Sequence, residues 1–162
     1  MDNAKVALDR IDQRILDALQ ADGRLSNVDL AGRVGLSPSP CLRRVKQLED
    51  AGMIDGYRAV LNRKAIGLGL TVFVEMKVGK HSRDNAAALQ QALLALPEVV
   101  SCHMVSGASD FLAEVVVPDL EAYERLMTDK ILTLPTIEDV RSNFAIRTVK
   151  SNGPLPLGHL AK

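Results

Sequence analysis

The second half of the chain alternates between the two-residue period of a strand and the 3.6-residue period of a helix, and this pattern strongly limits the possible folds. Residues 70–78, LTVFVEMKV, alternate strictly in polarity, as in a strand with one buried face. A helical stripe follows in DNAAALQQALLALP, then two strands, EVVSCHMV and DFLAEVVV, joined by SGAS. A second stripe, DLEAYERLMTDKILTLP, precedes a last strand, DVRSNFAIRTVK. The stripes comprise Ala86, Leu89, Leu93 and Leu96, and then Leu120, Tyr123, Met127, Ile131 and Leu134.

An internal repeat supports the order strand, helix, strand, strand, helix, strand. LALPEV ends the first helical stripe and LTLPTI ends the second, and in each a Leu-x-Leu-Pro closes a helix before a strand. Two such units predict a ferredoxin-like antiparallel sheet with both helices on one face. The other face, which carries Phe73, then has no cover, and self-association is the simplest way to bury it.

The first fifty residues contain the signals of three short helices. The apolar side chains of LDRIDQRILDALQ recur at helical spacing, and we expect this helix to end near Gly23 in the left-handed cap conformation. In LSNVDLAGRVG, Ser26 and Asp29 fit a capping box that starts a second helix. Gly35 ends that helix about nine residues later.

The third helix begins only two or three residues after Gly35, in SPSPCLRRVKQLEDAG. Proline is tolerated in the first turn of a helix, where its missing N–H would have no partner. Because Pro40 disfavours helical angles at Ser39, that serine is one candidate for the N-cap, and Ser37 before Pro38 is the other. Two helices joined by so short a turn must cross steeply, which predicts a helix-turn-helix.

At about 100° per residue, the third helix has an apolar side and a polar, basic side. Cys41, Val45 and Leu48 share the apolar side and should pack on the first two helices. The opposite side and the helix start carry hydroxyl, guanidinium, amine and amide groups, which are the groups that contact base edges and phosphates. The candidate DNA-binding residues are Ser37, Ser39, Pro40, Arg43, Arg44, Lys46 and Gln47.

The charge distribution favours DNA binding over the alternative of an ordinary solvated helix face. The chain has no formal net charge, yet residues 24–48 contain five Lys or Arg and one Asp. Residues 65–162 contain nine Lys or Arg and eleven Asp or Glu. In the third helix, acids occur only at the far end, whereas a solvated helix more often carries them in its first turn. The positive charge is therefore local, as in an element that contacts phosphate.

The sequence carries no sign of a catalytic or metal site. No Walker loop, GxGxxG, GxSxG or HExxH motif occurs. Cys102 and His103 are adjacent in a predicted strand, so their side chains point to opposite faces and cannot share a metal ion. His81 in a loop and His159 in the tail have no neighbouring ligand set. We therefore expect no enzyme activity, no cofactor and no metal, and SGASD alone is typical of a hairpin turn.

Composition and patterning predict a globular cytoplasmic protein. The chain is 47% hydrophobic and 25% charged, which is typical of a folded domain rather than a disordered one. No apolar run approaches the roughly 18 residues of a membrane span, and the start MDNAKVALDR lacks the apolar region of a signal peptide. Two distant cysteines without a CxxC motif indicate reduced thiols in a cytosol.

Five segments in order resemble the Lrp/AsnC family, the feast/famine regulators, and most closely its leucine-responsive branch. They are LDRIDQRILDALQADGR, SNVDLAGRVGLSPSPCLRRVKQLEDAGMI, GYRAVLN, VSGASDF and LPTIEDVRS, and the resemblance spans roughly residues 8–150. It implies a bacterial or archaeal, amino-acid-responsive transcription regulator that binds double-stranded DNA at pseudo-palindromic sites. It also implies homodimers that assemble into tetramers or octamers, with an amino acid bound between dimers.

The resemblance also implies an effector site. The family's Gly-x-x-Asp loop matches Gly107 and Asp110, with Met104 and Ser106 just before it. By position, Leu120 and the strand residues Asn143, Phe144 and Ala145 should line the same pocket. An amino acid carries an ammonium and a carboxylate: the hairpin N–H groups can meet the carboxylate, and Asp110 can pair with the ammonium or order the turn.

The predicted architecture is α+β. A helix-turn-helix (winged-helix-like) DNA-binding domain should span residues 1–53, a linker strand or hinge 54–68, a ferredoxin-like βαββαβ effector and oligomerisation domain 69–150, and a tail 151–162. Two other functions stay open at this point. One is a haem-pathway decarboxylase, some of which resemble the family in both domains, and the other is an amino-acid-binding partner protein with a vestigial helix-turn-helix. The basic face of the third helix disfavours the decarboxylase.

Overall fold

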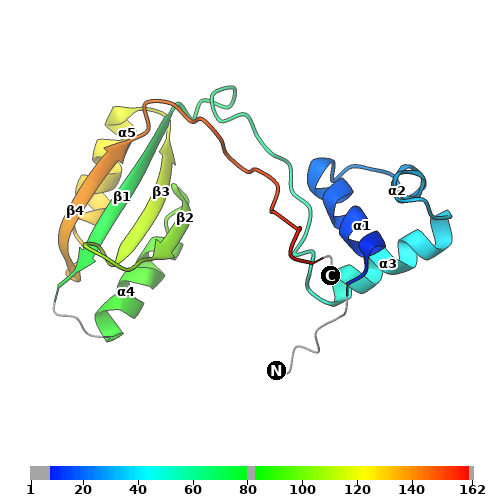
Figure 1. The fold of residues 1–162 in the computed structure, drawn as a ribbon. Helices are drawn as coiled ribbons and strands as arrows, with labels where there is room; N and C mark the ends of the chain where they lie inside the picture. Colours follow the sequence, from blue (N-terminus) through cyan, green and yellow to red (C-terminus); the bar gives the residue numbers. More distant parts are fainter. Residues whose placement is uncertain (1–7, 80–82, 161–162) are drawn as a thin grey trace. The chain divides into compact units, whose positions relative to one another are not determined.

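The computed structural model describes residues 8–79 and 83–160, so the prediction for His81 lies outside the described residues. The chain forms two compact units (Figure 1). One comprises Met1–Val60 together with Lys150–Lys162, and the other comprises Leu61–Val149. The C-terminal tail therefore belongs to the same unit as the first helices, which nothing in its sequence indicated.

The described residues of the first unit form three helices: α1 (Arg10–Ala21), α2 (Asn27–Val34) and α3 (Pro38–Asp50). One apolar side of each helix faces the others, as the periodicity predicts, and Cys41 and Leu48 of α3 are buried. Each such aliphatic side chain contributes about 1.5–3 kcal/mol when fully buried. The buried core consists of Ile15, Leu16, Leu30, Ala31, Val34, Cys41 and Leu48.

The ends of α1 differ from the prediction. Gly23 does not cap the helix: the cap is Asp22 in an extended conformation, and Gly23 has no positive φ. At the other end, Asp9 and Asp12 form a full capping box that was not predicted. The Asp9 carboxylate accepts the N–H of Asp12 at 2.9 Å, and the Asp12 carboxylate accepts the N–H of Asp9 at 3.1 Å. The signal was present, because an acid precedes the apolar run and another follows three residues later.

The turn between α2 and α3 forms as expected. Gly35 has φ 76° and ψ 37°, and the N–H of Leu36 donates to the carbonyl of Ala31 at 2.9 Å, which is the Schellman pattern. Of the two candidate N-caps of α3, Ser37 holds the position, with Pro38 as the first helical residue, so the Ser39 alternative is wrong. Ser26 caps α2, although its partner Asp29 bonds the Ser26 hydroxyl rather than its N–H.

The segment after α3 is extended but unpaired. Among the described residues, no strand occurs between α3 and Leu70, so the predicted linker strand pairs with nothing in this chain. Apolar side chains on it remain open, with Val60 76% exposed and Leu61 63% exposed. A single isolated strand is not stable without a partner, and this extended segment is unpaired within the described residues.

The second unit has the predicted order of elements: β1 (Leu70–Val78), α4 (Arg83–Leu94), β2 (Val99–Met104), β3 (Phe111–Val117), α5 (Leu120–Leu126) and β4 (Ile137–Phe144). The strands form one sheet in the order β2-β3-β1-β4, and every neighbouring pair is antiparallel. Both helices lie behind the sheet in Figure 1, on one face of it. This is the ferredoxin-like arrangement, and the chain as a whole is α+β as predicted.

The helix-covered face of the sheet carries the core of this unit. Alternate residues of β1 pack there with alternate residues of β3, and the register pairs Leu70 with Val117 and Met76 with Phe111. One helical prediction fails. Leu120 is 63% exposed, because it is the first residue of α5 and the buried side is formed one turn later by Tyr123, Leu126 and Met127. A π-helical turn, Met127–Ile131, continues α5 and was not predicted.

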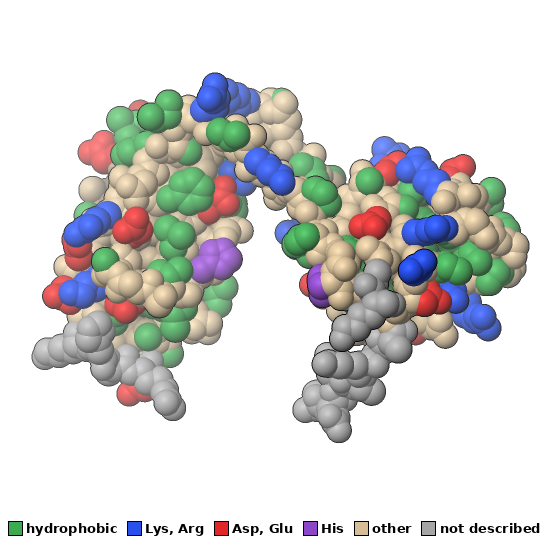
Figure 2. Space-filling view, viewed as in Figure 1, with side chains coloured by type: hydrophobic (Ala, Val, Ile, Leu, Met, Phe, Trp, Pro, Cys, Tyr) green, Lys and Arg blue, Asp and Glu red, His purple; other side chains and the backbone are tan. Residues whose placement is uncertain are grey.

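The opposite face of the sheet has no helix over it within the described part of the chain. Phe73 lies on this face and is 39% exposed. Figure 2 shows apolar side chains among acidic and basic ones here. Arg63 crosses to the Glu114 carboxylate at 2.7 Å, and the Glu75 carboxylate accepts bonds from Asn143 at 3.0 Å and Ser109 at 3.2 Å. The face is therefore a mixed surface with an ordered polar network.

Candidate DNA-binding and effector sites

The outward side of α3 carries open polar groups. Ser37, Ser39, Arg43, Lys46 and Gln47 are exposed. No carboxylate of the described residues pairs with the cations of Arg43 or Lys46. Pro40 is half-buried and stiffens the first turn. A rigid helix start followed by free donors is suited to a major groove, where donor groups contact base edges and phosphates.

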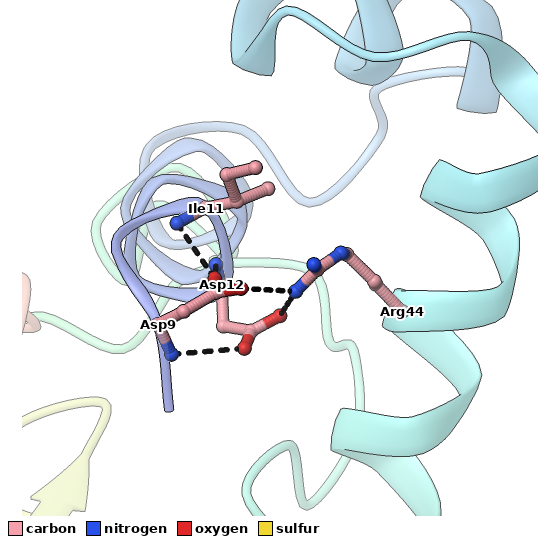
Figure 3. A network of polar contacts seen from close by, with 4 residues as sticks. All are labelled: Asp9, Ile11, Asp12 and Arg44. Atoms are coloured by element: carbon pink, nitrogen blue, oxygen red, sulfur yellow. Dashed lines mark hydrogen bonds and ion pairs between the residues drawn. The ribbon is translucent and has the colours of Figure 1, made fainter. Parts of the chain in front are cut away.

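Arg44 is arranged differently from its neighbours (Figure 3). Its guanidinium donates to the carboxylates of Asp9 and Asp12 at the start of α1, both at 2.8 Å. The bond from the N–H of Asp12 and the nearby Arg44 hold the pKa of the Asp9 carboxyl below its usual range, and bonds to Asp12 and Asp9 raise the pKa of Arg44. Arg44 therefore ties α3 to the capping box of α1, and its predicted contact with DNA would have to compete with two carboxylates.

A second contact between helices, from α2 to α3, was not predicted. The side-chain amide of Asn27, the first residue of α2, donates to the carbonyl of Pro38 at 2.8 Å. Because Pro38 is the first residue of α3, this bond fixes the two helix starts relative to each other. A sequence pattern does not reveal such a bond, since Asn27 and Pro38 meet only after the helices have packed. α3 is thus linked to α1 through its own Arg44 and to α2 through Asn27.

We predict that Arg44→Ala destabilises the helix-turn-helix unit by about 1–2 kcal/mol, because it leaves the partly buried Asp12 carboxylate without its cation. Arg43→Ala removes the same charge and the same side-chain length from an exposed neighbour, so it is a matched control. Thermal unfolding followed by circular dichroism measures both. If the two variants unfold at the same temperature, the bridge from Arg44 contributes no stability.

In the second unit, the hairpin between β2 and β3 contains a glycine with positive φ and two backbone N–H groups without a described acceptor. Gly107 has φ 124°, a conformation that favours glycine. No described acceptor takes the N–H groups of Gly107 and Ala108. Backbone N–H groups exposed in such a turn can bind a carboxylate.

Asp110 orders this hairpin. Its carboxylate accepts the N–H of Val78 at 2.8 Å, its own N–H donates to the carbonyl of Met76 at 3.0 Å, and its carbonyl accepts the N–H of Val105 at 2.9 Å. The side chain thus joins the hairpin to the end of β1. Of its two possible roles, pairing with an ammonium or ordering the turn, the contacts within the chain support the second.

The predicted effector residues do not form one pocket within a single chain. Met104, Ser106, Gly107 and Asp110 lie near the Val78 end of β1, whereas Leu120, Phe144 and Ala145 lie near the Leu70 end. The two ends of this nine-residue strand are roughly 26 Å apart at about 3.3 Å per residue. Asn143 lies between them on the open face, and Phe144 points to the helix side, where its ring contacts Tyr123. Adjacent residues of a strand point to opposite faces of the sheet, which explains why Asn143 and Phe144 lie on different faces.

Other chemistry is not visible in the described parts of the two units. No group of three His, Cys, Asp or Glu side chains there could hold a metal ion. Cys102 packs against the core while His103 is exposed on the opposite face, as their adjacency predicts. Cys41 is buried, and burial raises the pKa of its thiol. No helix among these residues is long and apolar enough to cross a membrane.

Comparison with known proteins decides the family. Residues 8–55 match the winged helix-turn-helix DNA-binding domain, and residues 71–155 match the Lrp/AsnC ligand binding domain. The leucine-responsive regulatory proteins of Klebsiella pneumoniae and of Escherichia coli K12 are each 45% identical over 148 residues, covering 91% of this chain and 90% of theirs. The chain belongs to the Lrp/AsnC family. It is a DNA-binding transcriptional regulator with an amino-acid-binding domain.

Solved structures agree with this family. A transcriptional regulator of Neisseria meningitidis in complex with L-methionine is 40% identical, with a TM-score of 0.91, and the match covers 94% of this chain and 99% of that one. An AsnC family regulator of Agrobacterium tumefaciens is 38% identical, with a TM-score of 0.89 and the same coverage. These relatives are transcriptional regulators and not enzymes, so the decarboxylase alternative has no support.

Proposed function

We propose that this Lrp/AsnC regulator binds pseudo-palindromic DNA as a homo-oligomer and changes its assembly or DNA affinity when it binds a small apolar amino acid, leucine or methionine. The observation that supports DNA binding is the set of exposed, unpaired hydrogen-bond donors on α3. The names of the relatives support the effector class, because one group is leucine-responsive and one structure holds L-methionine. We place the protein in the cytoplasm of a bacterium, because its relatives are DNA-binding regulators of bacteria.

For DNA recognition we propose Ser37, Ser39, Pro40, Arg43, Lys46 and Gln47 as the contacting residues. Arg43 and Lys46 supply cations that no described acid neutralises, and Gln47 supplies an amide that can read a base edge. We propose a supporting role for Arg44, because its guanidinium is held by Asp9 and Asp12. It positions α3 instead of contacting bases.

For the effector we propose a composite site made by two copies of the chain. The Gly107–Asp110 hairpin of one copy would supply N–H groups for the ligand carboxylate. The exposed apolar residues at the other end of a neighbouring sheet, Leu120 and Phe144, would contact the ligand side chain. The distance between the two groups within one chain supports this division. A ligand held by two copies stabilises their association by its differential affinity for the associated state.

We expect the protein to be at least a dimer at micromolar concentration, because no helix of the described residues covers the face of the sheet that carries the exposed Phe73, and a second sheet can cover it. A two-fold dimer presents two α3 helices and should prefer half-sites about one helical turn, or a multiple of it, apart. Light scattering coupled to size exclusion measures the mass. A mass of 17.5 kDa, that of one chain, would exclude the proposed assembly.

Two measurements on the full chain test the proposed function. Selection of random DNA duplexes at two salt concentrations should enrich two-fold symmetric sites, and affinity should fall steeply with salt. Thermal shift against the twenty amino acids should single out leucine, methionine or a close relative. Ligand binding without any DNA binding would instead favour an amino-acid-binding partner protein with a vestigial helix-turn-helix.

A further inference from the structure

The C-terminal tail contacts the helix-turn-helix unit at a specific place. The side-chain amide of Gln20, near the end of α1, makes two bonds to the backbone of Leu155: its oxygen accepts the Leu155 N–H at 2.6 Å and its NH₂ donates to the Leu155 carbonyl at 3.3 Å. Leu157 and Leu160 are half-buried and pack against the core of the three helices. Polar and apolar contacts thus come from the same short segment.

These contacts occupy one side of a groove of about 300 Å³ on the helical unit. Leu16 and Leu19 of α1 form one wall, and residues 53–57 after α3 form another. Tyr57 belongs to the second wall, where its hydroxyl donates to Glu49 at 3.1 Å. None of the exposed α3 donors lines the groove, so a segment bound there leaves the proposed DNA-contacting side open.

The sequence of the tail suits this binding. Pro154 and Pro156 flank Leu155, so the segment is stiff and extended before it binds, and Leu155 supplies the only N–H among the three residues. A stiff segment loses less conformational entropy on docking than a flexible one. Leu157 then starts a turn in which the N–H of Leu160 donates to the Leu157 carbonyl at 3.0 Å, and this turn returns a second leucine to the helices.

We propose that residues 154–160 are a built-in docking segment that completes the core of the DNA-binding unit. That unit is therefore discontinuous in sequence, with residues up to 60 and the tail folding together, and the chain passes between the two units twice. The tail stabilises the helices and does not act as an inhibitor, because it binds away from the outward side of α3.

Amide hydrogen exchange on the full-length protein tests the docking. The N–H of Leu155 should be protected in the parent protein and should exchange at the unfolded rate in Gln20→Ala, which removes both of its bonds. Protection in the parent should be independent of protein concentration, because the segment docks on its own chain. An unprotected Leu155 amide in the parent, or protection that vanishes on dilution, would overturn the proposal.

Stability supplies a second readout. Leu157→Asp should lower the unfolding temperature by about 4–8 °C and raise the exchange rate of α1 amides. Leu155→Asp is the matched control, because this side chain is 71% exposed and only its backbone is used, so its unfolding temperature should change by less than about 2 °C. Equal shifts in the two variants would refute the apolar docking.

Affinity for double-stranded DNA at about 15 °C should stay within about twofold of the parent in both variants. Tighter DNA binding by Leu157→Asp would instead show that the tail is inhibitory.

Discussion

Replacing Asp110 with alanine should weaken binding of the amino-acid effector by about tenfold to a hundredfold and abolish its effect on thermal stability and on oligomer size. The Asp110 carboxylate accepts the N–H of Val78, and this bond holds the β2–β3 hairpin against the end of β1. Without it, a buried N–H loses its partner and the hairpin donors are no longer fixed, which costs about 1–3 kcal/mol. Calorimetric titration with L-leucine and L-methionine measures the loss.

Asp110→Asn separates the two roles of the side chain. Asparagine keeps an oxygen that can accept the N–H of Val78 but carries no charge. If Asp110 orders the turn, Asp110→Asn should retain most of the affinity for the amino acid. If Asp110 pairs directly with the ligand ammonium, Asp110→Asn should bind the amino acid as weakly as Asp110→Ala does. DNA binding should remain largely intact in both, because the substitution lies in the other unit. Parental affinity in Asp110→Ala would place the pocket elsewhere.

Arg43→Ala should weaken binding to the selected operator by about 1–3 kcal/mol, or roughly five- to 150-fold. Arg43 is exposed on α3 and has no carboxylate partner among the described residues, so its donors are available to a base edge. Gel-shift titration at two salt concentrations measures the affinity and its salt dependence. A base contact reduces affinity for the operator more than for unrelated DNA, whereas a phosphate contact weakens both equally and flattens the salt slope by about one charge.

Two controls make this result specific. Arg125→Ala removes one cation from the other unit, where Arg125 pairs with Glu121, and should leave operator affinity unchanged. Arg44→Ala should act mainly through stability, so its loss of DNA binding should shrink when the assay temperature is lowered. Unchanged operator binding by a folded Arg43→Ala protein would remove α3 as the recognition helix.

Local sequence signals determined most of the elements. The strict alternation of residues 70–78 produced β1 with its buried and open sides, and the short Gly35 turn produced the steep crossing of α2 and α3. These features depend on a period or on one residue's allowed backbone angles, so neighbouring residues suffice to reveal them. Local signals were misleading at Gly23 and at Leu120, where a helix ends or begins and packing decides the outcome.

Only the tertiary structure determined the contacts between residues that are far apart in the chain. The sequence placed Arg44 among the candidate DNA-binding residues, but its two carboxylate partners, 32 and 35 positions earlier, make it a link between α3 and α1. The effector residues share a family pattern yet lie at two ends of one sheet, because strand register sets their separation. The tail, 135 positions from Gln20, joins the DNA-binding unit through backbone bonds that no side-chain pattern records. The period of a sequence predicts on which face of a helix or strand a residue lies. Only the folded structure shows which residues pack against that face.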